Sequence, residues 1–237
     1  MNEPYFKKGV LLLNVGTPEH PEINSIKKFL KEFLMDPRVI NFPYIYRWSI
    51  LNFLILPRRP AKVAIKYKRI WKTEGSPLML YSKRIKQLLS EDLGEKYVVN
   101  IAMRYGAPSI KTSINYLMKQ NINQLQIIPM FPQYSSATTG SAIEKVLKTI
   151  EKFNYFPKIQ INNSFYNHPG YVQAIANIGN NCKPEEFDHI LFSFHGLPIS
   201  QLRNQSSKSS CLQSSECCQE ICSTNHHCYR AQCFQTA

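Results

Sequence analysis

The strongest constraint on the fold is the alternation of short apolar runs with segments whose apolar residues recur at helical spacing. A run such as residues 10–14 (VLLLN), apolar up to its last position, is typical of a strand buried on both faces. Strands separated by helices favour a parallel sheet covered on both sides. The sequence therefore predicts an α/β fold, with strands at residues 10–14, 98–103, 125–130, 159–162 and 189–194, and helices at 22–35, from 108 onward, 141–152 and 171–178.

Polar loops follow four of these predicted strands. They are residues 14–18 (NVGTP), 104–106 (RYG), 132–136 (PQYSS) and 195–198 (HGLP). In open parallel sheets, ligands bind beyond the carboxyl ends of the strands. We therefore expect the four loops to contribute to one site.

The charge of the chain favours acidic partners. Among its 237 residues, Lys and Arg outnumber Asp and Glu by 29 to 16, a formal net charge of +13. Nucleic acid, anionic lipid and a polyanionic small molecule all remain compatible with this excess. An apolar content of 43% is enough for a globular core and excludes a disordered chain.

An apolar stretch at residues 43–57 (PYIYRWSILNFLILP) contains Arg47 and is shorter than the roughly 20 residues of a membrane span. Arg58, Arg59 and Lys62 follow it directly. The cations alone are compatible with a solvated charge run. Beside an apolar lip, they also suit a flat, greasy ligand with carboxylate tails, or a membrane surface.

Six of the seven cysteines lie within residues 211–233, and the odd total excludes a fully paired monomeric disulfide framework. No secretory signal is visible, so we expect a cytoplasmic, reducing environment, where clustered cysteines more often bind metal. Zinc and an iron–sulfur cluster both suit thiolate ligands. The lone Cys182 is expected to pack in the core. The clustered residues are Cys211, Cys217, Cys218, Cys222, Cys228 and Cys233.

Standard nucleotide and hydrolase motifs are missing from the sequence. It contains no GxGxxG, no GxxxxGK[ST] and no GxSxG. His195, after a predicted strand, can be a proton acceptor, a metal ligand or a structural histidine bonded to backbone. The hydroxyl-rich residues 132–141 can be a turn with a helix cap or a polar pocket at a helix N-terminus.

Taken together, the motifs resemble ferrochelatase, the enzyme family that inserts ferrous iron into porphyrin. The resemblance implies a chelatase-like α/β fold of two Rossmann-like parallel-sheet halves with a porphyrin cleft between them. It assigns residues 1–165, including the lip at 43–57, to the first half and residues 166–237, including 211–233, to the start of the second. The matching blocks are 11–18 (LLLNVGTP), 36–40 (DPRVI), 67–78 (YKRIW..EGSPL), 103–110 (MRYGAPSI), 132–142 (PQYSSATTGSA) and 191–198 (LFSFHGLP).

The resemblance also implies roles for individual residues. His195 matches the histidine proposed in the family as iron ligand or proton acceptor. Arg58, Arg59 and Lys62 fall on the segment that meets the porphyrin propionates. The remaining residues expected to contact porphyrin are Val15, Tyr67, Ser76, Arg104 and Tyr134.

Residues 211–233 resemble a segment of some bacterial ferrochelatases that carries a [2Fe-2S] cluster. The candidate ligands are Cys211, one or both of Cys217 and Cys218, and then Cys228 and Cys233.

The family continues past this segment with a further strand and a His-x-Glu-Thr-Leu-like block that supplies a carboxylate opposite the histidine. The present sequence ends at Ala237. We therefore expect an incomplete second half and weak or absent turnover by this chain alone.

The expected function is conversion of protoporphyrin IX to protohaem, with Fe²⁺ as substrate, porphyrin as the small-molecule partner, no nucleic acid, and peripheral membrane contact through the lip. Two alternatives stay open. One is a non-catalytic porphyrin or haem carrier; the other is a basic module folded around zinc and cysteines.

Overall fold

The computed structural model describes residues 6–203, 212 and 217–237. These divide into two compact units. The sheet unit comprises the described residues of Met1–Met130 and Ala137–Asn162, and the cysteine unit those of Phe131–Ser136 and Asn163–Ala237.

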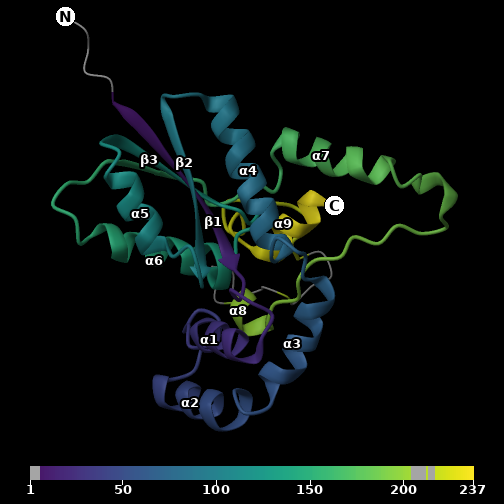
Figure 1. Ribbon diagram of the computed structural model, residues 1–237. Helices are drawn as coiled ribbons and strands as arrows, with labels where there is room; N and C mark the ends of the chain where they lie inside the picture. Colours follow the sequence, from purple (N-terminus) through teal and green to yellow (C-terminus); the bar gives the residue numbers. More distant parts are fainter. Residues whose placement is uncertain (1–5, 204–211, 213–216) are drawn as a thin grey trace, which may run out of the picture. The chain divides into compact units, whose positions relative to one another are not determined.

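The sheet unit is built on four parallel strands in the described chain (Figure 1). They are β1 (Lys7–Gly16), β2 (Tyr97–Tyr105), β3 (Ile122–Pro129) and β4 (Lys158–Ile161), in the order β2-β1-β3-β4. The central strand β1 places Leu11 opposite Asn100 of β2 and Ile127 of β3. The predicted α/β class, with a parallel sheet, is confirmed.

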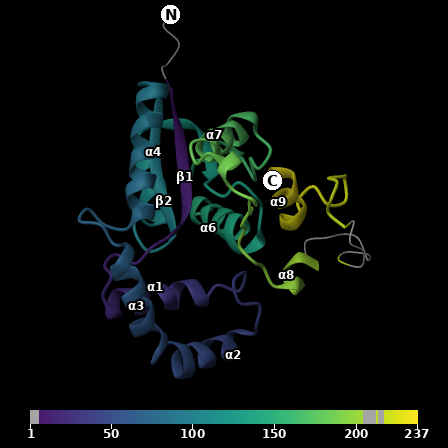
Figure 2. The same ribbon diagram turned by 90° about the vertical axis from the view of Figure 1, so that its right-hand side faces the viewer.

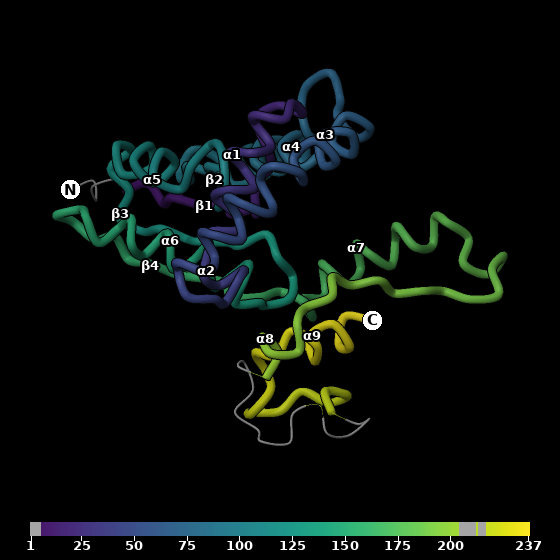
Figure 3. Tube along the Cα trace, turned by 90° about the horizontal axis from the view of Figure 1, so that it is seen from below, coloured from purple at the N-terminus to yellow at the C-terminus, as the bar shows by residue number. Residues whose placement is uncertain are grey.

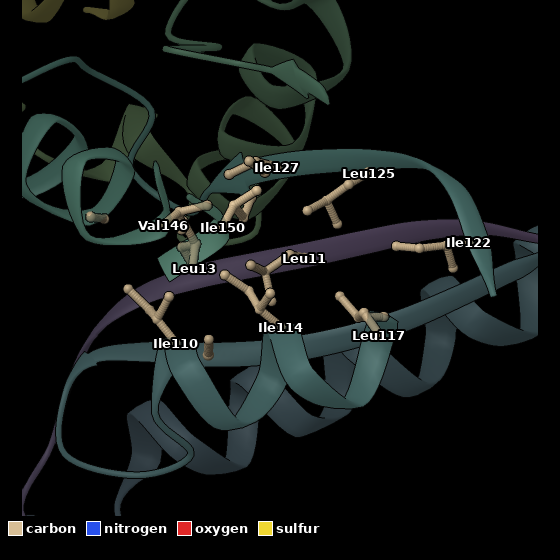
Figure 4. Close-up of a cluster of buried hydrophobic side chains, with 12 residues drawn as sticks. Leu11, Leu13, Ile110, Ile114, Leu117, Ile122, Leu125, Ile127, Val146 and Ile150 are labelled. Atoms are coloured by element: carbon tan, nitrogen blue, oxygen red, sulfur yellow. The ribbon is translucent and has the colours of Figure 1, made fainter. Parts of the chain in front are cut away.

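Helices cover both faces of this sheet, as Figure 2 shows from the side. Leu11 and Leu13 of β1 face α5 (Ile110–Met118) and α6 (Ser141–Ile150) in one fully buried cluster (Figure 4). Val10 and Leu12, on the alternate positions, face α4 (Pro77–Leu93) on the other side. Because successive side chains of a strand point to opposite faces, β1 must be apolar throughout.

A third buried cluster lies at the carboxyl end of β1 and β2. It joins α1 (Ile23–Leu34), the π-helical turn η1 (Ile50–Ile55) and α3 (Arg59–Ile70) around Tyr105. The short α2 (Tyr44–Ser49) precedes η1 and is continuous with it. Figure 3 shows α1, α2 and α3 in a view along this end of the sheet unit. Residues 44–55 of the apolar stretch are therefore helical.

The cysteine unit contains α7 (Pro169–Asn180), the 3₁₀ turn η3 (Pro184–Glu186), α8 (Ile199–Arg203) and α9 (Tyr229–Thr236). None of the twelve residues of α7 is buried. After residue 187 the chain runs back beside α7 (Figures 1 and 3), and the two segments line an apolar cavity of about 500 Å³.

The predicted strand at residues 189–194 is wrong. In the structure this segment makes no strand pairing with the described chain, and Leu191 is 90% exposed. A strand is stable only when its backbone N–H and C=O groups bond to a neighbouring strand. The apolar pattern of residues 189–194 does not by itself provide that neighbour.

Candidate functional site

The carboxyl ends of β1 and β2 approach each other so closely that only glycine fits. A Cβ on Gly16, where φ is +105°, would lie 1.8 Å from the carbonyl oxygen of Tyr105. A Cβ on Gly106, where φ is +87°, would lie 2.9 Å from the carbonyl oxygen of Thr17. Both glycines also occupy backbone conformations that other residues avoid. The close approach of the two backbones therefore requires glycine in both the NVGTP loop and the RYG loop.

A buried carboxylate, Asp36, organises the polar groups at this end of the sheet. Its Oδ2 atom accepts hydrogen bonds from Arg104 Nη2 at 2.5 Å, from the Tyr105 hydroxyl at 2.8 Å and from Ser141 Oγ at 2.5 Å. Its Oδ1 accepts from the backbone N–H of Arg38 at 2.8 Å. Only 3% of the Asp36 side chain is exposed, and it forms an ion pair with Arg104.

The hydrogen bonds decide the ionisation of Asp36. Burial is the largest single influence and raises the pKa of the carboxyl group. The bonds from Ser141, the Arg38 amide and Tyr105, with the charge of Arg104, together outweigh burial and hold the pKa below its usual value. Asp36 is therefore a permanent anion at neutral pH. Its partner Arg104 also donates from Nε to Ser141 Oγ at 2.7 Å and lies over the Tyr105 ring.

Sequence reasoning picked out Arg104 but missed Asp36, Tyr105 and Ser141 as its partners. All three lie within the motif blocks at 36–40, 103–110 and 132–142. Arg104 and Asp36 are 68 residues apart, so no local pattern reveals their contact.

Three other expected porphyrin contacts have structural roles of their own. Ser76 is buried and caps α4, its Oγ accepting from Met79 N at 3.3 Å. Tyr67 and Val15 pack against the cluster at the carboxyl end of the sheet. Burial raises the pKa of Tyr67, and the Thr17 hydroxyl partly opposes that rise.

The three expected propionate ligands lie together at the start of α3. Arg58, Arg59 and Lys62 are all exposed, and none of them forms an ion pair with a described residue. Pro60, inside the first turn, suits this helix start because its missing N–H would be unbonded there anyway.

The stretch at 43–57, which we call the lip, presents large apolar side chains to solvent. The lip is held by one buried cation, Arg47, whose Nη1 donates to the carbonyl oxygens of Ile40 at 3.2 Å and Phe42 at 2.8 Å. Within the described part of the chain, no helix is both long and apolar enough to cross a membrane. The most exposed large apolar side chains of the lip are Tyr44, Ile45, Tyr46 and Phe53.

His195 and Tyr134 belong to the cysteine unit, whereas the other expected porphyrin contacts belong to the sheet unit. The His195 side chain is exposed. The hydroxyl of Tyr229 lies by the His195 backbone. Burial and the neighbouring Cys233 raise the pKa of Tyr229 to about 12, and the His195 backbone opposes that rise. The backbone N–H of Tyr134 donates to Gln232 Oε1 at 2.6 Å.

The sulfur atoms of three candidate cluster ligands lie close together. Cys218 Sγ lies 3.5 Å from Cys217 Sγ and 3.8 Å from Cys228 Sγ. Burial, with these two thiols nearby, raises the pKa of Cys218 to about 12, so the group holds a thiolate poorly without a compensating cation. Cys233 is buried on α9.

The remaining cysteines fall outside this group. Cys222 is exposed and bonds locally to Thr224. Cys182 is exposed as well, so the expectation that it packs in the core is wrong. Cys211 lies outside the described residues. Among those that are described, no three His, Cys, Asp or Glu side chains are arranged to hold a metal ion.

Comparison with known proteins decides the family. The family model named Ferrochelatase matches residues 7–237. The chain belongs to the ferrochelatase family. It is 40% identical over 232 residues to a ferrochelatase of Coxiella burnetii (strain Dugway 5J108-111), 38% identical to one of Bdellovibrio bacteriovorus, and 42% identical to one of Legionella pneumophila (strain Paris).

Each of these matches covers 98% of this chain. The chain spans 64% of the length of the Coxiella ferrochelatase and 68% of the other two. The resemblance drawn from the six motif blocks is thus confirmed at the level of the family. The parallel-sheet fold of the sheet unit agrees with it.

Proposed function

We propose that this chain takes part in ferrochelatase chemistry, the insertion of Fe²⁺ into protoporphyrin IX to give protohaem. The observation that carries the proposal is its 38–42% identity, over 98% of its length, with three proteins named ferrochelatase. The glycine-dependent loops after β1 and β2 support it, because ligands of parallel sheets bind beyond the carboxyl ends of strands.

His195 is the proposed proton acceptor and iron ligand. Metalation removes two protons from the pyrrole nitrogens, and a neutral imidazole can take one of them or donate a lone pair to the metal. The side chain of His195 is exposed, so a ligand can reach its imidazole nitrogens.

The proposed porphyrin contacts divide by chemistry. Arg58, Arg59 and Lys62 offer three exposed positive charges within one helical turn of each other, suited to two propionates. Arg104 is fixed on one side by Asp36 and Ser141. In this proposal Arg104 supplies a positive charge held in a fixed position. The apolar and hydroxyl contacts are assigned to Val15, Tyr67, Ser76 and Tyr134.

An insertion assay tests the catalytic role. The purified protein is mixed anaerobically with protoporphyrin IX and Fe²⁺ or Zn²⁺, and the loss of free porphyrin is followed by fluorescence. If the unsubstituted chain inserts metal, even slowly, His195→Ala is expected to abolish that insertion, and His189→Ala, an exposed histidine six residues away, serves as the control. Insertion retained in His195→Ala would remove that residue from the mechanism. Porphyrin binding without insertion by the unsubstituted chain would favour the carrier alternative.

We also propose that the cysteine-rich segment holds a [2Fe-2S] cluster. The donor chemistry fits, because soft sulfur atoms gather at Cys217, Cys218 and Cys228, and a cluster would supply the positive charge that their thiolates lack. Cys233 and Cys211 complete the candidate ligands.

Visible absorption, with iron and acid-labile sulfide analysis of anaerobically purified protein, tests the cluster. We expect Cys228→Ser to lose the absorption and Cys182→Ser to keep it. A colourless protein that contains zinc would overturn the proposal.

We further propose a cytoplasmic protein whose lip touches a membrane surface. Cys182, Cys218, Cys228 and Cys233 form no disulfide bond, which suits a reducing compartment. Exposed aromatic residues next to Arg58 and Arg59 suit an anionic lipid interface. Sedimentation with anionic vesicles tests the contact, and Phe53→Ser is expected to weaken it. Equal binding by that variant would argue against the lip.

A further inference from the structure

Helix α9 is tied to the Phe131–Ser136 loop by a buried side-chain amide. Gln232, only 1% exposed, accepts from the backbone N–H of Tyr134 at 2.6 Å through Oε1. Its Nε2 donates to the carbonyl oxygen of His226 at 2.7 Å. One amide group thus bridges the loop and the cysteine-rich segment, and both ends are satisfied.

A second contact holds the same helix against the same loop. Gln133 Nε2 donates to Thr236 Oγ1 at 2.9 Å, one helical turn beyond Gln232. The Thr236 hydroxyl in turn lies 3.2 Å from the carbonyl oxygen of Tyr166. All of these residues belong to the cysteine unit, so the arrangement is internal to it.

The position of α9 depends on the cysteines. Cys228 directly precedes the helix and packs with Cys218 and Ala231 in a buried cluster. Gln232 lies on the next turn, adjacent to Cys233. Any change at these sulfur atoms that shifts α9 also shifts the oxygen that the Tyr134 amide bonds to.

We propose that Gln232 is a positioning residue that couples the cysteine-rich segment to the Tyr134 loop. Gln232 has no part in the chemistry; it sets where the loop backbone lies in response to the cysteines. The consequence for porphyrin rests on the proposed function, because Tyr134 is a proposed porphyrin contact. The coupling itself does not depend on that function.

Amide hydrogen exchange of residues 131–136 tests the bridge. In Gln232→Met the Tyr134 N–H loses its acceptor, and we expect its exchange to quicken about 2- to 10-fold, the range for one net hydrogen bond. Gln235→Met on the same helix is the matched control, since Gln235 is exposed and its Nε2 donates to the carbonyl oxygen of Gln219, outside the 131–136 loop. Unchanged Tyr134 exchange in Gln232→Met would overturn the proposal.

Two further variants separate coupling from simple loss of structure. Gln232→Glu keeps an oxygen for Tyr134 N–H but, as a carboxylate, cannot donate to His226, so we expect it to restore part of the Tyr134 protection. Introduced alone, Cys228→Ala should quicken Tyr134 exchange. Combined with Gln232→Met, it should quicken that exchange little further, because the two changes act through one contact. Additive effects would mean two independent influences and would refute the coupling. Exchange in α7, which belongs to the same unit, reports whether each variant stays folded.

Porphyrin binding distinguishes this inference from the proposed function. If protoporphyrin IX fluorescence shows binding, Gln232→Met should weaken it and Gln235→Met should not. If the unsubstituted chain does not bind porphyrin, the proposed function fails while the exchange experiments still decide the coupling.

Discussion

The sheet unit and the cysteine unit treat similar apolar sequence in opposite ways. In the sheet unit, Leu11 and Leu13 of β1 are fully buried between helices and neighbouring strands. In the cysteine unit, the apolar side chains of α7 and of residues 189–194 stay exposed or half-exposed. An apolar run is therefore buried only where partner elements surround it.

The largest expected effect comes from removing the buried anion of the sheet unit. Asp36→Ala leaves Arg104 in the interior without its counter-charge, and loss of one partner of a buried pair costs about 3–5 kcal/mol. Urea unfolding followed by circular dichroism measures this loss. Lys183→Ala, which breaks the exposed Lys183–Glu186 pair of the cysteine unit, should change stability by less than about 1 kcal/mol. Similar losses of stability in both variants would contradict the difference between the two units.

The same carboxylate gives the sheet unit an acid-sensitive stability. Because the folded-state pKa of Asp36 is lowered, its contribution is present above the unfolded-state value of about 4 and is lost as pH falls through the folded value. The unfolding free energy should therefore decline below pH about 4 in the unsubstituted protein and decline less in Asp36→Ala. Parallel pH curves would contradict the assignment.

A matched pair of isoleucines tests the same difference in burial between the two units. Ile114 on α5 is 0% exposed and Ile178 on α7 is 68% exposed. Ile114→Ala leaves a cavity and should cost about 2–5 kcal/mol. Ile178→Ala should change stability by no more than about 0.5 kcal/mol, because it removes little buried surface. Denaturant titration of both variants provides the measurement, and a large cost at Ile178 would show that α7 is covered in solution.

The smallest effect is a difference in thiol reactivity within the cysteine unit. Cys182 is exposed, whereas Cys218 is buried and has its pKa raised to about 12. At pH 8 the Cys218 thiol is therefore almost entirely protonated, and alkylation needs the thiolate. Iodoacetamide followed by peptide mass spectrometry should label Cys182 long before Cys218. Equal labelling would mean that the small buried cluster of this unit opens freely.

The sequence predicted the sheet unit well because its signals are local. The apolar runs at 10–14, 98–103, 125–130 and 159–162 each coincide with a strand of the sheet, and only the last strand in the order, β4, has no buried residue. The helix expected from residue 108 begins at Ile110, with Ser109 accepting from Thr112 N. The segment at 189–194 carries the same signal without a pairing partner, so the same rule failed there.

What the sequence could not reveal depends on contacts between distant residues. Asp36 and Arg104 meet across 68 positions, and Tyr134 and Gln232 across 98. Gln232 lies in the run CYRAQC, whose cysteines indicate metal binding but whose pattern indicates no role for the glutamine. Its burial on α9 was the missing information, since a glutamine in an eight-residue helix is usually a surface residue.

The central place of β1 has a consequence for synthesis of the chain. Leu11 leaves the ribosome first, yet its partners Asn100 and Ile127 follow 89 and 116 residues later. At about 5–20 residues per second, the most apolar strand waits about 6–23 s for both neighbours. During that interval Lys7 and Lys8, just ahead of the VLLL run, act as charged gatekeepers against aggregation of the nascent chain.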